Sequence, residues 1–115
     1  VAGTRADDHY TVGGTAVADE GVLDAVERGY AGNERDAPLA RRLLTALAAG
    51  ERAGGDGRDL SVGSAAIVVK SSDNPLYHDL RVDASETPVA DLRETYRQAK
   101  RGYEEALAQY QTENS

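Results

Sequence analysis

The chain has 115 residues, carries a net charge of −7 and contains no cysteine. This length suits one small domain rather than two. The missing cysteines exclude disulfides, thiolate metal sites and a cysteine nucleophile. A nucleic-acid surface needs a basic stripe, which 20 acidic against 13 basic residues do not provide. No segment approaches the roughly 18 apolar residues of a membrane span, so we expect neither a nucleic-acid nor a membrane partner.

The composition also bears on the core and on the cellular setting. Phe, Trp and Met are absent and only six Tyr are present. Because aromatic side chains normally supply much of the buried area, this scarcity predicts that a further segment completes the core. Lysine occurs only at Lys70 and Lys100. An acidic, lysine-poor chain is typical of a halophilic archaeon or of a GC-rich genome, and we expect a reducing cytoplasm as the location.

The first 35 residues predict an extended segment followed by a helix. Val1 to Val17 contains β-favouring residues and then Gly13-Gly14, a turn or close-approach signal. Asp19 can cap a helix that begins at Glu20 or Gly21 and ends at Gly32. Its apolar residues recur at helical spacing: Val22, Leu23, Val26 and Tyr30.

A second helix is predicted to run to about Arg52. Asp36 is its candidate N-cap and Pro38 occupies a position that the first turn allows. The glycine-rich segment 54–57 ends it. Its apolar stripe consists of Leu39, Leu43, Leu44 and Leu47.

The segment 65–82 predicts a β-hairpin. Ala65 to Val69 is continuously apolar and predicts a strand buried on both faces. A turn cluster, 71–75, separates it from a second strand over Leu76 to Val82. Alternate residues of a strand share a face. Along this strand and the residue that follows it, three charged residues are therefore expected on the same face: Asp79, Arg81 and Asp83. Such an ion-pair array orients a polar substrate or holds a neighbouring segment.

The final helix is predicted from Val89 to about Gln111, with Thr87 as its cap and Pro88 in its first position. Tyr96, Tyr103 and Tyr110 recur every seven residues. This spacing predicts a packing stripe that faces either the core or another chain. We therefore expect a homo-oligomer.

Motifs for cofactor or metal chemistry are absent. The sequence has no P-loop, no dinucleotide fingerprint, no paired metal-binding histidines and no Gly-x-Ser-x-Gly elbow, so we expect no cofactor and no metal. His9 and His78 are far apart and are expected to be exposed or packed on strands. Backbone amides at Gly13-Gly14-Thr15 can bind an anion or an oxyanion, or form an ordinary turn. The segment 54–57 is likewise either a functional loop or an ordinary end of the preceding helix.

The order strand, helix, helix, strand, strand, helix predicts an α/β (α+β) class with mainly antiparallel sheets in layers. Four segments in this order, 2–17, 41–56, 64–69 and 79–93, resemble the C-terminal half of the domain of unknown function 1028 family. That family is similar to the N-terminal-nucleophile (Ntn) hydrolases. The resemblance implies part of an αββα four-layer sandwich. It also implies an amide-bond hydrolase whose N-terminal Thr, Ser or Cys uses its own α-amine as base.

The resemblance places the nucleophile outside this chain, in an N-terminal half that would be its partner. Val1 has no nucleophilic side chain and Thr4 is not terminal. Residues 1–93 would form the C-terminal half of the domain, and 94–115 a helical extension with a polar tail. Where the family often has Gly-Asn and Ala-Gly-His-Arg, this chain has Gly14-Thr15 and, at 2–5, Ala-Gly-Thr-Arg.

Candidate site residues follow from the resemblance by position. Gly14 and Thr15 would border the oxyanion region. Gly55 also matches the family pattern by position. The residues expected to bind or brace a polar substrate are Asp56, Ser64, Asp79, Arg81 and Asp83. The function implied is the C-terminal portion of an Ntn-type amide hydrolase. The alternatives are a non-catalytic homolog that serves binding or oligomerisation, and a small binding module that folds alone.

Overall fold

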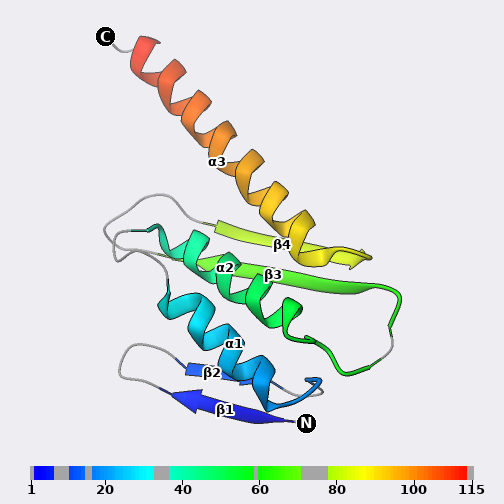
Figure 1. Cartoon of the computed structure of the whole chain (residues 1–115). Coiled ribbons are helices and arrows are strands. Elements are labelled where there is room, and N and C mark those ends of the chain that lie inside the picture. The colour runs from blue at the N-terminus through cyan, green and yellow to red at the C-terminus, as the bar shows by residue number, and fades with distance from the viewer. Residues whose placement is uncertain are drawn as a thin grey trace.

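The computed structural model describes residues 2–6, 11–14, 17–32, 37–58, 60–70 and 78–113. In this part of the chain, three helices accompany two separate two-stranded antiparallel sheets. The α+β class with antiparallel sheets is therefore confirmed. Figure 1 shows both sheets with the helices on one side of them, which is a two-layer arrangement.

The N-terminal sheet is a hairpin rather than one extended segment. Strand β1 (Gly3–Ala6) pairs with strand β2 (Thr11–Gly14), and Gly3 and Thr4 lie opposite Gly14 and Gly13. The expected strand-to-helix turn at Gly13-Gly14 was wrong, because both residues belong to this ladder. A Cβ at Gly14 would approach Val17 Cγ1 to 3.0 Å, so the close-approach interpretation of this glycine holds. His9 and Thr15 lie outside the described residues.

Helix α1 (Glu20–Ala31) begins and ends where the sequence predicts. The Asp19 carboxylate accepts a hydrogen bond from the Gly21 backbone N–H at 2.8 Å, which satisfies one of the free amides of the first turn. Gly32 terminates the helix, and its N–H binds the Arg28 carbonyl oxygen. The cap prediction is thus confirmed.

Helix α2 (Leu39–Arg52) ends as predicted but begins differently. Pro38 occupies the cap position itself, without a side-chain hydrogen bond, whereas Asp36 lies outside the described residues. Proline has a fixed φ that suits the start of a helix and no N–H to satisfy. Gly54 and Gly55 follow the helix with φ of 123° and 54°, a backbone conformation that favours glycine.

Two glycines let α1 and α2 cross closely. A Cβ on Gly29 would lie 2.7 Å from the Ala49 Cβ, and one on Gly50 would lie 2.5 Å from a Val26 methyl group. The Arg42 guanidinium stacks over the Tyr30 ring at 4.4 Å from its centroid. Small side chains at the crossing therefore set the distance between the two helices.

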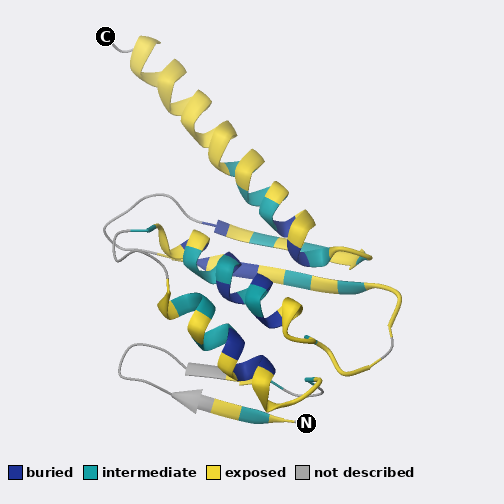
Figure 2. Cartoon of the chain, in the orientation of Figure 1, coloured by how far each residue is buried: buried dark blue, intermediate teal, exposed yellow. Residues whose placement is uncertain are grey.

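Strands β3 (Gly63–Val69) and β4 (His78–Ser85) form the predicted antiparallel hairpin, with Ile67 opposite Leu80. The prediction that β3 is buried on both faces was wrong. Ile67 and Val69 are buried, but Val68 between them is 59% exposed. Helices cover only one face of this sheet (Figure 2), and an apolar run cannot indicate from its sequence how many faces are covered.

The main core lies between the β3–β4 sheet and helices α2 and α3. Its buried members are Ala40, Leu44, Ile67, Val69 and Leu92. His78 is buried beside them, and its ring meets the Tyr96 ring edge-on with centroids 5.1 Å apart. The strand-packed alternative for His78 is thus confirmed.

Helix α3 (Pro88–Glu113) begins after Thr87 as predicted. The Thr87 and Ser85 hydroxyls both donate to the Asp91 carboxylate in the first turn. The first turns pack on the sheet, and every residue from Lys100 to Glu113 is exposed. The helix therefore projects well beyond the body of the molecule (Figures 1 and 2).

Candidate functional site

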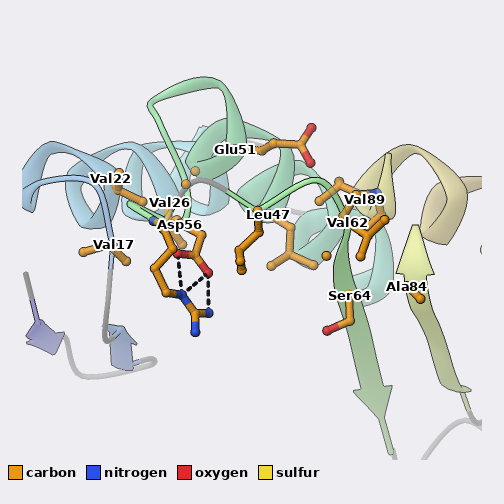
Figure 3. A pocket seen from close by; sticks show the side chains of 16 residues that line it. Val17, Val22, Val26, Leu47, Glu51, Asp56, Val62, Ser64, Ala84 and Val89 are labelled. Atoms are coloured by element: carbon orange, nitrogen blue, oxygen red, sulfur yellow. Dashed lines mark hydrogen bonds and ion pairs between the residues drawn. The ribbon is translucent and has the colours of Figure 1, made fainter. Parts of the chain in front are cut away.

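A cavity of about 640 Å³ lies between the helical pair and the start of β3. Figure 3 shows its lining, with Val17 and Val22 toward one end and Ala84 and Val89 toward the other. The wall is mostly aliphatic, and four residues give it polar side chains: Glu51, Asp56, Arg58 and Ser64. An apolar hollow with a few polar groups is the usual form of a small-molecule site.

Asp56 and Arg58 form the charged pair of this cavity. Arg58 Nε donates to Asp56 Oδ1 at 2.9 Å and its terminal nitrogen to Oδ2 at 2.5 Å. The Arg58 backbone N–H also donates to Oδ1 at 2.9 Å. The Arg58 side-chain hydrogen bonds, followed by the backbone hydrogen bond, lower the pKa of Asp56 to about 2. The carboxylate is therefore a fixed anion and a poor proton acceptor.

The turn after α2 determines where Asp56 lies. The positive φ values of Gly54 and Gly55 reverse the chain, and the Gly55 carbonyl accepts a hydrogen bond from the Ala18 backbone at 2.8 Å. Val17 and Asp56 then form an isolated antiparallel bridge. The glycine-rich segment is thus both a helix terminator and the support of a cavity residue.

A second set of predicted residues lies on the face of the β3–β4 sheet opposite the helices. We call this the open face and define it by Ser64, Ala66, Val68, Asp79, Arg81 and Asp83, all of which are exposed. Ala66 lies opposite Arg81, and Val68 opposite Asp79. The Arg81 guanidinium donates to Asp83 Oδ1 at 2.9 Å. This hydrogen bond, with smaller contributions from the charges of Asp83 and Asp79, raises the pKa of Arg81.

The predicted site residues therefore fall into two places. Gly55, Asp56 and Ser64 line the cavity, whereas Asp79, Arg81 and Asp83 share only the open face. Ser64 belongs to both. Gly14 does not line the cavity, and Thr15 lies outside the described residues.

Most residues of the cavity were not predicted from the sequence, and Arg58 and Ala84 are the two most informative of them. Arg58 follows Asp56 by two positions, a spacing at which an aspartate side chain binds the backbone N–H ahead of it, so this signal was available. Ala84 has φ of 54°, unusual for a residue other than glycine. No sequence pattern indicated this conformation. A shift of register in β3 between Gly63 and Ala65 accompanies it on the opposite strand.

Within the described ranges, no group of three or more His, Asp and Glu side chains is placed to hold a metal ion. None of the helices described combines the length and the apolar character needed to cross a bilayer.

These features define a small α+β unit with helices on one side of two antiparallel hairpins. Comparison with known proteins identifies its family: residues 1–92 match the model of the family of unknown function DUF1028, and the chain belongs to that family. A solved structure, protein SPO2555 from Silicibacter pomeroyi, carries the same family assignment. It is 30% identical with a TM-score of 0.72, and the match covers 86% of this chain and 40% of that protein. No curated protein matches.

Proposed function

We propose that this chain is the C-terminal portion of an Ntn-type amide hydrolase whose N-terminal portion supplies the nucleophile. The observation that carries the proposal is the extent of the structural match. Most of this chain superposes on the Silicibacter pomeroyi protein, yet it accounts for only 40% of that protein. The family resemblance in segments such as 41–56 and 79–93 adds the Ntn character.

The surfaces of the chain support a second portion packed against it. Val68 on the open face is 59% exposed, and Leu60 and Val62 at the rim of the cavity are 57% and 45% exposed. Exposed aliphatic side chains beside a sheet face with no helix on it favour burial by further protein. An upstream portion that covers the open face would supply the additional layers of an αββα sandwich.

In this proposal an N-terminal Thr, Ser or Cys attacks the amide carbonyl. Its free α-amine accepts the proton of the hydroxyl or thiol and later returns it to the leaving amine. Gly14 and Thr15 would border the oxyanion. Arg81, hydrogen-bonded to Asp83, would orient a polar substrate or brace the site, and the Asp56–Arg58 pair would present a fixed guanidinium at the cavity.

The test uses the protein with the sequence encoded upstream of Val1. We expect its mature N-terminus to be Thr, Ser or Cys. We also expect a β-lactone probe to label this residue, as shown by peptide mass spectrometry, and denatured protein to remain unlabelled. A mature N-terminus of any other type would overturn the catalytic proposal.

A non-catalytic homolog is the second candidate, and one observation favours it. Thr4 occupies the exposed position on β1 where the family often has His. A threonine cannot replace the imidazole as a proton carrier near neutral pH. Intact protein that hydrolyses no member of an amide library, but gains activity on a Thr4→His change, would favour this alternative.

A further inference from the structure

The projecting part of α3 carries an apolar stripe that the body of the molecule does not cover. The stripe begins in the core, with Val89 and Leu92 buried and Tyr96 half-buried against the sheet. It continues at the same spacing through Tyr103, Leu107 and Tyr110, which are 37%, 42% and 65% exposed. Figure 2 shows the helix as exposed along this outer part. A continuous stripe that leaves its core is typical of a helix that packs on another helix.

The sizes of the residues in the stripe select an antiparallel partner. Tyr96, Tyr103 and Tyr110 occupy one heptad position, and Ala99 and Ala106 occupy the other. In a parallel pair, equivalent positions meet, so tyrosines would crowd one layer and alanines would leave a gap in the next. In an antiparallel pair Tyr103 and Tyr110 face Ala106 and Ala99 of the second copy, which fills these layers evenly.

The charges along the projecting part select the same orientation. Its first half contains Arg97, Lys100 and Arg101, whereas its second half contains only acidic charges: Glu104, Glu105 and Glu113. A parallel pair would place like charges together. An antiparallel pair places the basic half of each helix beside the acidic half of the other, and such complementarity fixes orientation.

We propose that the outer part of α3, residues 97–113, pairs with the same segment of a second copy of this chain as an antiparallel two-helix coil centred near Tyr103. The segment measures about 25 Å at 1.5 Å per residue. The family match ends at residue 92, so this surface lies outside the matched region. The pairing does not depend on the hydrolase proposal.

Sedimentation equilibrium of the native protein tests the pairing. We expect a concentration-dependent dimer that weakens at least tenfold on Tyr103→Asp, because the substitution places a charge in the central layer. Ala108→Asp is the matched control: it adds the same charge to the same exposed helix about 140° around from Tyr103 and should leave the dimer intact. Circular dichroism verifies that both variants keep their helix. A protein that is monomeric at all concentrations, or equal weakening by both variants, would overturn the proposal.

Cross-linking tests the orientation, and the absence of cysteine gives a clean background. An Ala99→Cys chain mixed with a Tyr110→Cys chain should form a mixed disulfide dimer under mild oxidation. Each variant alone should cross-link at least tenfold less. Efficient cross-linking of each variant with itself, and not with the other, would show a parallel pair and overturn the antiparallel geometry.

Discussion

The two ends of helix α3 carry the same apolar spacing in opposite environments. At the first end Leu92 is fully buried among Ile67 and Val69 of the sheet. At the other end Leu107 is 42% exposed, on a helix that has left the body of the molecule. The difference shows that spacing identifies the face of a helix that packs, whereas the fold determines what that face packs against.

The largest expected effect distinguishes these two leucines. Leu92→Ala should lower the free energy of unfolding by about 2–5 kcal/mol, because it removes a fully buried side chain and leaves a cavity. Leu107→Ala, its control in the same helix, should cost less than about 1 kcal/mol. Urea unfolding of the two variants measures both values, at a protein concentration low enough to keep dimers dissociated. Equal losses would mean that the outer helix is as well packed as the inner one.

Two glycines extend the comparison to the backbone. Gly29→Ala should destabilise by about 1–3 kcal/mol, since the new Cβ would lie 2.7 Å from the Ala49 Cβ where α1 and α2 cross. Gly102→Ala should stabilise by about 0.5–1 kcal/mol, since its surroundings are open and alanine favours helix. Thermal unfolding, monitored by circular dichroism, shows whether each substitution lowers or raises the stability. A gain at Gly29 would contradict the close crossing.

His78 and Tyr96 mark where the helix still contacts the sheet, and pH tests this contact. Burial lowers the pKa of His78 below its ordinary value. Above about pH 6.5 the ring is neutral in both folded and unfolded chains. As the pH falls from there through the lowered pKa, the unfolded chain takes up the proton more readily and stability is lost. Urea unfolding at pH 7.5 and 5.5 measures the loss, and His78→Phe should reduce it while keeping the aromatic contact.

The smallest expected effect concerns Glu94, on the exposed side of α3. The Gln98 side-chain hydrogen bond, followed by the charge of Arg97, lowers the pKa of this carboxyl. NMR titration should show the lowered pKa, and Gln98→Ala should raise it toward the ordinary value. A variant with an unchanged titration curve would show that this exposed hydrogen bond is not maintained in solution.

Local signals predicted the elements well where one residue decides the boundary. Asp19 and Gly32 bound α1, and Pro88 opens α3, because caps and proline act within one turn. Burial was predicted less well. Val68 is exposed although it lies within an apolar run, because its burial depends on whether anything covers the second face of the sheet. The β1–β2 pairing was missed although its strands are close in sequence, because residues 7–10 between them contain no glycine or proline to mark a turn.

For the candidate site too, local features were predicted and features that join distant segments were not. Alternation along β4 correctly placed Asp79, Arg81 and Asp83 on one face, because strand periodicity is local. The cavity was not predictable, since its wall combines α1, α2, β3 and the start of α3.

The two-glycine turn after α2 has a consequence for the order of folding. The helical pair α1–α2 consists of neighbouring segments joined by a short connection, a local arrangement that forms quickly. The hydrogen bond from Ala18 to Gly55 joins positions far apart in sequence and requires the left-handed backbone at Gly54 and Gly55. We therefore expect this closure to follow formation of the helical pair. A side chain at either glycine should therefore slow the joining of the segment before α1 to the end of α2 and leave the helices themselves largely unaffected.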